Sequence, residues 1–420
     1  MGDFGLLVPL TLAVVEASRV RPGDSVAGCG PNSTGGTLIR PGGRDAYAAF
    51  WIRDFAISLE SGVIALEELE HALRLTARLQ ASNHWETPTG SIIPRGSIAD
   101  HITLDGTPVF FPGTNSLETQ GQPWGYYPSL DDNFYFVEMA WQLVRIPGRS
   151  EMLDEKIDGV SLLERLDLAF HATPTREDSG LVWCDEEKRG VSFGFTDVVV
   201  QTGDLLFCSI LRYRAASQLA DLQEMVGNTE IANRYRSIAK RISRNVPRVF
   251  AHESGLLRAA TGKSGQPDVW GSAFAVYSGL LGKQKSAEVS SALHKALAAG
   301  TISWRGNIRH LPTNLDFNEH TAWEKTVNDY PKNRYQNGAY WSTPTGWVCF
   351  AVAQVDESAA RHLAMEYLQD LRNGDFRQGY RFGSPYECIH PDGDYRNNPV
   401  YMTSVTCPLG AFRRLGWITN

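Results

Sequence analysis

Carboxylic acids beside aromatic rings recur at several places in this chain, close to apolar stretches with helical spacing. A carboxyl group can donate or accept a proton during a reaction, and an aromatic ring can stack on the flat face of a ligand. Two carboxyl groups are the strongest candidates for acid–base chemistry: Asp197 in GVSFGFTDVVV and Glu387 in FGSPYECIHPDG.

The surroundings of these two residues predict different roles. Asp197 follows Phe193 and Phe195 and precedes three valines, and burial among apolar groups raises a carboxyl pKa, as a general acid requires. Asp185 or Glu186 in WCDEE could be the acid instead. Glu387 precedes a Pro-Asp-Gly turn and could hold a water molecule as a base, although a surface glutamate would give the same pattern.

Three further stretches have the composition of a binding surface. WIRD contains Trp51, Arg53 and Asp54, and an ionised aspartate near a helix N-terminus can accept hydrogen bonds from two hydroxyl groups. Asp131 lies in the first turn of another helical stretch. In both places the aspartate could equally be structural, as a helix cap or as one partner of an ion pair.

The stretch YQNGAYWSTPTGW places Tyr335, Gln336, Asn337 and Trp341 on the turn that opens an apolar helix. The amides could hydrogen-bond ligand hydroxyls, the rings could stack, and Gly338 would let the backbone approach a ligand closely. A capped core helix with rings packed beneath it is the alternative interpretation.

Helical periodicity dominates the elements that must position these residues. We predict twelve helices joined by loops of uneven length, with long loops at 83–130, 172–203 and 300–342. This pattern predicts one domain, residues 1–420, built as a double ring of helical hairpins with the long loops around a central pocket. The predicted helices are 5–18, 47–61, 66–82, 131–145, 160–171, 204–220, 229–248, 270–282, 286–299, 343–353, 357–371 and 401–415.

Composition and charge exclude several classes of partner. A net charge of −7 over 420 residues gives no reason to expect nucleic acid or an anionic membrane. The six scattered cysteines and the lack of a signal-peptide pattern predict a cytoplasmic protein. The spacing of His310, His320 and His390 matches no metal site, and the acidic run 392–398 lacks the final acidic ligand of a calcium loop, so we expect no metal and no cofactor.

Taken in order, these stretches resemble the six-hairpin glycosidases, the (α/α)6-barrel enzymes that include trehalase, the bacterial α-glucosidase and glucosylglycerate hydrolase group, and the glucosidase part of glycogen-debranching enzymes. The motifs that carry the resemblance are short and lie within residues 45–415. They are WIRD, Ser129-Leu-Asp131 with its aromatics, Gly194-Phe-Thr-Asp197, Tyr335-Gln-Asn-Gly338 with Trp341, and Glu387 before Pro391.

The resemblance implies an inverting, exo-acting glycoside hydrolase that acts on a short α-glucoside or a related small glycoside. Asp197 would be the general acid and Glu387 the base, with carboxyl groups about 6.5–9.5 Å apart. The residues implied to bind the sugar are Trp51, Arg53, Asp54, Asp131, Tyr335, Gln336, Asn337, Trp341 and Tyr386.

Two other classes of function remain open. A sugar epimerase or polysaccharide lyase on a similar helical barrel would need a histidine pair, or a tyrosine or histidine with an arginine, facing the sugar. A non-catalytic carbohydrate-binding protein would not need Asp197 and Glu387 to converge. Arg53, Arg334 and Arg381 could bind an acidic aglycone such as glycerate.

Overall fold

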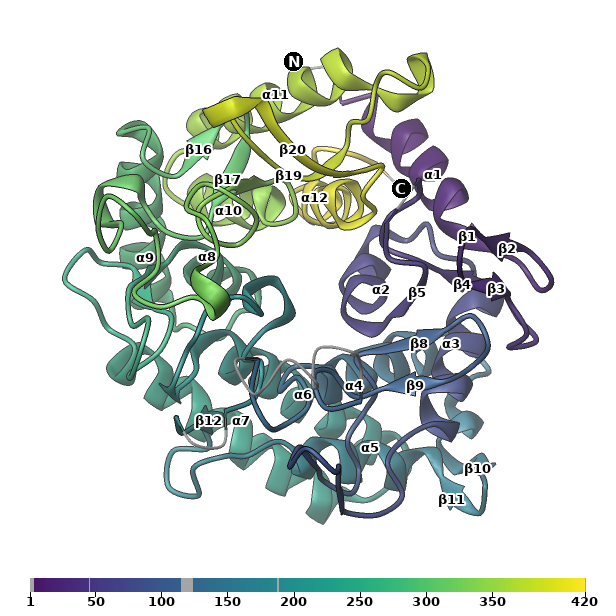
Figure 1. Cartoon of the computed structure of the whole chain (residues 1–420). Coiled ribbons are helices and arrows are strands. Elements are labelled where there is room, and N and C mark those ends of the chain that lie inside the picture. Colours follow the sequence, from purple (N-terminus) through teal and green to yellow (C-terminus); the bar gives the residue numbers. More distant parts are fainter. Residues whose placement is uncertain (1–3, 45, 115–123, 187–188, 420) are drawn as a thin grey trace.

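The computed structural model describes residues 4–44, 46–114, 124–186 and 189–419. Twelve α-helices in these ranges form two concentric rings (Figure 1). Each inner helix packs against the next, and α12 packs against α2, which closes the ring. The inner helices are α2 (Ile52–Ser58), α4 (Asp132–Val144), α6 (Leu206–Met225), α8 (Val269–Tyr277), α10 (Thr345–Ala353) and α12 (Thr403–Arg414).

The other six helices form the outer ring, and each packs against one or two inner helices. The predicted double ring of helical hairpins is therefore confirmed. The outer helices are α1 (Leu7–Ser18), α3 (Leu66–Arg78), α5 (Leu162–Ala172), α7 (Thr229–Val249), α9 (Lys283–Ala298) and α11 (Glu357–Gly374).

The sequences of the two rings differ as their positions require. All nine residues of α8, VWGSAFAVY, are buried, because an inner helix contacts neighbours on every side. The outer helix α7 has 21 residues and buries a single stripe, with charged or polar side chains over most of the rest. The stripe consists of Ala232, Tyr235, Ala239, Ile242 and Val246.

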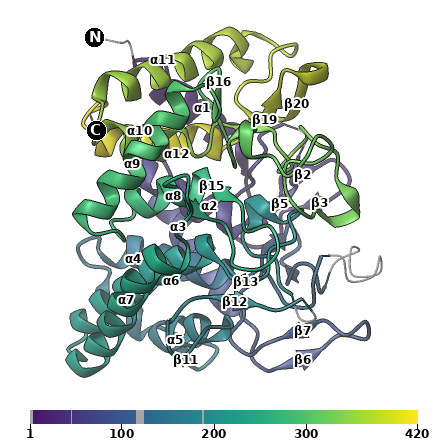
Figure 2. The same ribbon diagram turned by 90° about the vertical axis from the view of Figure 1, so that its left-hand side faces the viewer.

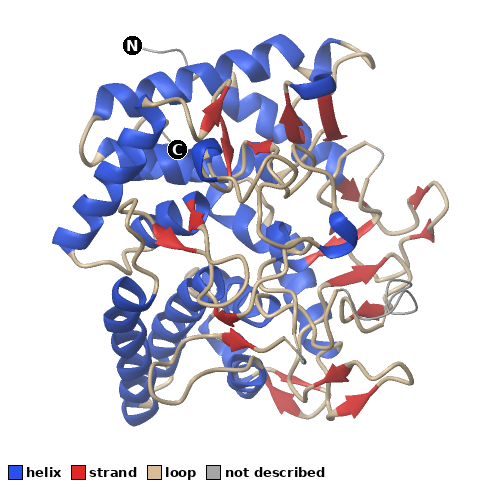
Figure 3. Ribbon diagram, turned by 60° about the vertical axis from the view of Figure 1, so that its left-hand side comes forward, coloured by secondary structure: helices blue, strands red, loops and turns tan. Residues whose placement is uncertain are grey.

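Short antiparallel sheets, which the sequence analysis did not predict, lie within the long connections. The largest has the strand order β16 (Ser303–Trp304), β17 (Asn307–Arg309), β18 (Tyr340–Trp341), β19 (Tyr386–His390) and β20 (Tyr395–Pro399). A second sheet pairs β5 (Ala49–Trp51), β8 (His101–Thr103) and β9 (Pro108–Val109). These sheets and long loops gather on one side of the helices (Figures 2 and 3).

The remaining strands form two-stranded ladders, namely β1 (Arg19–Val20) with β4 (Leu38–Ile39), β2 (Ser25–Val26) with β3 (Gly30–Pro31), β6 (Trp85–Glu86) with β7 (Ile92–Ile93), β10 (Lys156–Ile157) with β11 (Val160–Ser161), β12 (Trp183–Cys184) with β13 (Gly203–Asp204), and β14 (Leu257–Arg258) with β15 (Pro267–Asp268). Within the described ranges, no helix combines the length and the apolar character needed to cross a membrane.

Candidate active site

A cavity with about 440 Å³ of empty space lies at the end of the barrel where inner helices α2 and α4 begin. The predicted residues that line it are Trp51, Arg53, Asp54, Asp197, Tyr335 and Glu387. Residues that we did not predict complete the lining: Tyr47, Asp100, Phe111, Ser129, Val191, Gly194, Phe195 and Tyr401.

Glu387 lies on β19 and is 1% exposed. Its Oε1 accepts a hydrogen bond from the Tyr47 hydroxyl at 2.8 Å. Its Oε2 accepts hydrogen bonds from the side-chain amides of Asn397 at 2.9 Å and Asn398 at 2.7 Å. Because the two amide groups can only donate here, this environment favours an ionised carboxylate.

Asp197 directly follows the short 3-10 helix Gly194–Thr196 and has a different environment. Its Oδ1 atom is buried and has no hydrogen-bond partner in the described part of the chain. Its sequence neighbours Phe193, Phe195 and Val198 are buried, and the Gln336 amide and the Val198 N–H interact with its carboxyl group. Burial favours the neutral form of this carboxyl group.

Both carboxyl groups have raised pKa values. Burial raises the pKa of Asp197 to about 7, against the opposing effects of the Arg53 charge and the Gln336 amide. Burial raises the pKa of Glu387 to about 8, and the charges of Asp54 and Asp197 add to this rise, whereas Tyr47 and Asn398 oppose it. The pair therefore retains a proton near neutral pH.

The order of these two pKa values would place the shared proton on Glu387, whereas the hydrogen bonds argue for Asp197. We assign the proton to Asp197, because the amides of Asn397 and Asn398 both donate to Glu387 and would lose a partner if Oε2 carried a proton.

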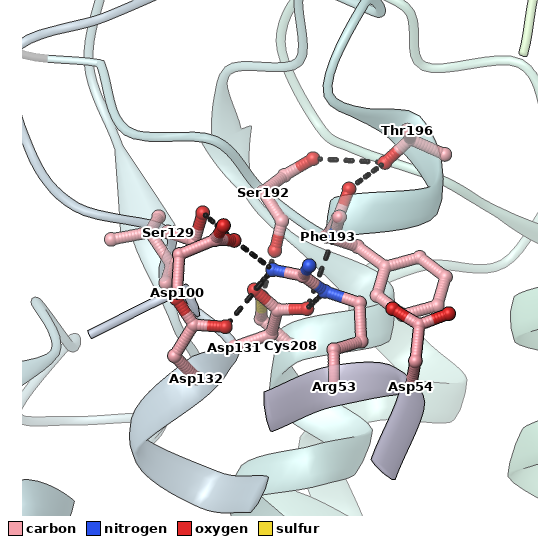
Figure 4. Close-up of polar contacts among 12 residues, drawn as sticks. Arg53, Asp54, Asp100, Ser129, Asp131, Asp132, Ser192, Phe193, Thr196 and Cys208 are labelled. Carbon is pink, nitrogen blue, oxygen red and sulfur yellow. Dashed lines mark hydrogen bonds and ion pairs between the residues drawn. The ribbon is translucent and has the colours of Figure 1, made fainter. Parts of the chain in front are cut away.

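Arg53, on α2, lies at the centre of a buried ion-pair cluster (Figure 4). Its guanidinium group contacts Asp131 at 2.7 Å, Asp132 at 2.9 Å and Asp100 at 3.0 Å. Asp54, the next residue, points away from this cluster (Figure 4) and accepts a hydrogen bond from Tyr401 at 2.7 Å. Burial raises the pKa of Asp54 to about 6.

Gly194 connects the Arg53 cluster to the loop that carries Asp197. Its backbone N–H donates to Asp131 Oδ2 at 3.1 Å. A Cβ atom at this position would lie 1.9 Å from Arg53 Cζ, so only glycine fits against the guanidinium plane. Asp131 therefore positions Arg53 and this loop from beneath the cavity, which it does not line.

The two amide side chains that were predicted to bind a sugar form hydrogen bonds with backbone groups instead. Gln336 and Asn337 are both 0% exposed. Gln336 accepts from the Val198 N–H and donates to the Gly194 carbonyl, so it holds both sides of Asp197. Asn337 accepts from the Ala322 N–H and donates to the Tyr330 carbonyl. The structure places neither amide in the cavity lining.

Trp341 and Tyr386 also lie outside the cavity lining. Trp341 is fully buried and packs edge-on against Phe195 and Trp270. Tyr386 precedes Glu387 on β19, so the two side chains point to opposite faces of the strand. Tyr386 lines a separate surface cleft with Trp304.

The alternative acids are also outside the lining. Asp185 and Glu186 are exposed, and Glu186 forms an ion pair with Lys263 at 2.6 Å. His310 is buried and stacks on Trp270, His390 stacks on Tyr340, and the side chain of His320 is 83% exposed. No histidine in the described ranges lines the cavity.

Sequence reasoning missed the groups that hold Glu387. Asn397 lies opposite Cys388 in the β19–β20 ladder, which brings it beside Glu387. The Pro-Asp-Gly turn between the two strands could have indicated this hairpin. Tyr47 had no such signal, because it is 340 residues away in the sequence.

Three residues around Glu387 have left-handed backbone conformations. The φ angles are 54° for Tyr47, 45° for Tyr335 and 40° for Asn398. Such values are uncommon for residues with side chains, and they cluster at functional sites where the surrounding structure enforces them.

Among the described residues, no group of His, Cys, Asp and Glu is arranged to hold a metal ion.

The double ring of helices and the end-on cavity define the fold of the six-hairpin glycosidases. The sequence matches no protein-family model and no curated protein. Among solved structures, the chain is similar to the glucoamylase from Saccharomycopsis fibuligera, with a TM-score of 0.59 and 12% identity over 97% of this chain and 94% of that one.

Two other solved structures have a similar fold. A mannosylglycerate hydrolase from Thermus thermophilus, in complex with glucose, gives a TM-score of 0.55 and 12% identity over 96% of this chain and 99% of that one. A rhamnosidase from Klebsiella oxytoca with rhamnose bound gives 0.56 and 11% identity. The present chain is covered fully in that comparison and spans 65% of the rhamnosidase. Identities this low establish the fold alone.

Proposed function

We propose that the protein is an inverting, exo-acting glycoside hydrolase that cleaves a short α-glucoside or a related small glycoside. Asp197 is the general acid and Glu387 is the general base. The observation that carries this proposal is the contrast between two carboxyl groups in one cavity. Three donors surround Glu387, whereas the Oδ1 atom of Asp197 is buried without a hydrogen-bond partner.

The chemistry follows from this contrast. Asp197 donates its proton to the glycosidic oxygen as the bond to the anomeric carbon breaks. Glu387 takes a proton from a water molecule, whose oxygen bonds to the anomeric carbon from the opposite face. The products are an alcohol and a sugar of inverted anomeric configuration. This geometry requires carboxyl groups about 6.5–9.5 Å apart, with room for the water between them.

The other lining residues have supporting roles in the proposal. Asp54 accepts hydrogen bonds from sugar hydroxyls through the oxygen that does not bond Tyr401. Trp51 and Tyr335 provide ring faces, and the Trp51 Nε1 donor has no partner in the described part of the chain. Gln336, Asn337, Asp131 and Trp341 position this lining. The extent of the domain, residues 1–420, and a cytoplasmic location stay predictions.

The position of the histidines favours hydrolysis over the alternatives. The described lining of this cavity contains no histidine, and the nearby His101 is engaged by stacking on Trp51 and by contact with Asp100, so the histidine pair that epimerase or lyase chemistry would need is missing there. The lyase variant that uses tyrosine and arginine would rely on Arg53, which three carboxylates already engage. A purely binding protein does not require two buried carboxyl groups with raised pKa values in one cavity.

A proton NMR time course on α- and β-linked disaccharides and glucosylglycerate tests the proposal. Release of the sugar as the opposite anomer is expected. Retention of configuration, an olefinic signal or an epimerised sugar would each contradict the inverting hydrolase. Binding without turnover across the panel would favour the non-catalytic alternative.

A further inference from the structure

A histidine covers one face of the Trp51 ring in the cavity. Trp51 is the last residue of β5 and His101 is the first residue of β8, and the two lie directly opposite each other in the antiparallel ladder. Side chains at opposed positions project from the same face of a sheet. The two rings stack, with centroids 4.1 Å apart and planes inclined by 21°. A sugar can therefore use only the other face of the indole.

The imidazole of His101 is itself held in place. Its Nδ1 atom lies 2.8 Å from Asp100 Oδ2, and Asp100 Oδ1 accepts a hydrogen bond from Arg53 at 3.0 Å (Figure 4). Burial acts to raise the pKa of Asp100, but the Arg53 charge and the His101 hydrogen bond outweigh it and lower the pKa. Asp100 is therefore an ionised acceptor, so Nδ1 of His101 carries a proton and donates it.

Packing alone orients the indole of Trp51. Its Nε1 atom is buried and has no hydrogen-bond partner among the described residues. The Tyr47 ring meets the indole edge-on, with centroids 5.3 Å apart, whereas the imidazole of His101 covers a whole face. His101 is not part of the described cavity lining, so any effect it has on a ligand passes through Trp51.

We propose that His101 is a positioning residue, which fixes the indole of Trp51 for contact with the sugar and connects it to the Arg53 cluster through Asp100. The inference rests on the proposed function, because it concerns a ring that would contact the sugar. Without the imidazole the indole is free to rotate, and the affinity for the sugar falls. The carboxyl groups that transfer protons stay in place. The expected signature is a higher KM with little change in kcat.

Two substitutions separate the ring of His101 from its anchor. His101→Asn keeps an N–H donor for Asp100 and removes the stacked ring, whereas His101→Phe keeps a ring and removes the donor. His101→Leu, which fills the space without a flat face, replaces the first variant if that one does not fold. His171→Asn is the matched control, because His171 contacts the Phe170 ring at 5.2 Å and Asp167 at 3.8 Å on α5, outside the cavity.

Fluorine NMR of the full chain labelled with fluorinated tryptophan reports on the indole without a ligand or turnover. The resonance that is missing from Trp51→Phe identifies Trp51. We expect a single narrow Trp51 resonance in the wild type, in His101→Phe and in His171→Asn, and a broadened or split one in His101→Asn. A single narrow Trp51 resonance in His101→Asn would overturn the proposal.

Steady-state kinetics on the glycoside that the protein cleaves measure the functional effect. We expect KM to rise about fivefold in His101→Asn, with kcat within about twofold of the wild type, and no change in His171→Asn. A fall in kcat at unchanged KM would contradict a role in positioning the sugar-binding ring. If no glycoside is cleaved, the hydrolase proposal fails, whereas the fluorine spectra still decide whether His101 positions Trp51.

Discussion

Tyr47 links the proposed base to the opposite end of the chain, through a single hydrogen bond to Glu387 at 2.8 Å. The hydroxyl stabilises the ionised form of the carboxylate, so it lowers the pKa of Glu387 against the larger effect of burial. The left-handed backbone of Tyr47 aims the ring at this position. The position of Tyr47 therefore governs the protonation of the base as well as its orientation.

Tyr47→Phe should move the acidic limb of the pH profile. Loss of the donor raises the pKa of Glu387, so the base becomes ionised only at higher pH. We expect the acidic limb of kcat/KM to shift upward by roughly one pH unit. Tyr335→Phe is the control, because its hydroxyl contacts Tyr47 at 3.4 Å and is not a donor to Glu387. Equal shifts in both variants would contradict a specific role for Tyr47.

Removal of either carboxyl group should stop turnover. Glu387→Gln and Asp197→Asn should each lower kcat by about 10²–10⁴-fold, with little change in KM, because proton transfer is lost and the shape of the cavity is retained. Steady-state kinetics check this. Glu186→Gln, at an exposed position, should keep full activity. A large loss in Glu186→Gln with an active Asp197→Asn would reassign the acid.

At the scale of the elements, Gly194 joins two segments that are far apart in the sequence. Gly194→Ala would push a methyl group into the Arg53 guanidinium and displace the loop that carries Asp197. We expect a loss of roughly 1–3 kcal/mol in the free energy of unfolding and a fall in kcat. Thermal melts and kinetics of purified protein measure both effects.

Gly282→Ala is the matched control for this substitution. A Cβ at Gly282 would have no atom within 4 Å, and its φ of −62° suits any residue. Full activity and stability in Gly194→Ala would mean that the loop and Arg53 can separate without cost.

Periodicity was sufficient to predict the helices, because the buried face of each helix is visible in its own segment as a regular repeat of apolar residues. The predicted segment 229–248 corresponds to α7, Thr229–Val249. The predicted segment 47–61 shortens to α2, Ile52–Ser58, because residues 49–51 pair with β8 instead. A strand such as β5 pairs with a distant partner, β8, and local sequence carries little record of such pairing.

The same contrast between local patterns and long-range contacts explains which residues of the site could be predicted. Motifs located Asp197, Glu387, Trp51, Arg53 and Asp54 at one cavity, because each motif is local. They did not separate side chains that face the cavity from those that support it. Gln336 and Asn337 look like ligand-binding amides in sequence, yet both bond backbone groups. Whether such a side chain faces the cavity or is buried behind it depends on the packing of the complete ring of helices, which a local motif does not show.

At the scale of the whole molecule, charge in the cavity should control substrate choice. The described lining contains four carboxyl groups, and its cation, Arg53, is engaged by three aspartates. We therefore expect the neutral methyl ester of glucosylglycerate to be hydrolysed with a kcat/KM roughly tenfold above that of the free acid. Added salt should narrow this difference. Preference for the free acid would instead indicate that Arg334 or Arg381 binds the carboxylate.

The same carboxyl groups should make stability depend on pH. Burial raises the pKa of Asp54 to about 6, of Asp197 to about 7 and of Glu387 to about 8. The folded protein thus holds protons that the unfolded chain loses near pH 4, so the free energy of unfolding falls as pH rises from about 4 to about 8.

Asp197→Asn should therefore raise Tm by roughly 1–3 °C at pH 8 and leave it nearly unchanged at pH 4. Calorimetry at both pH values measures this, with Glu186→Gln as the control at an exposed position. An equal change in Tm at both pH values would show that the effect does not come from the titration of Asp197.

The closure of the ring between α12 and α2 has a consequence for how the protein matures. The contacts Tyr47–Glu387 and Asp54–Tyr401 span 340 and 347 residues. Contacts of such long range form late in folding, and during synthesis Glu387 leaves the ribosome only after the helices from α1 to α11 have emerged. A nascent chain can thus assemble most of its hairpins while it still lacks the proposed base, and the proposed hydrolase activity would report completed folding.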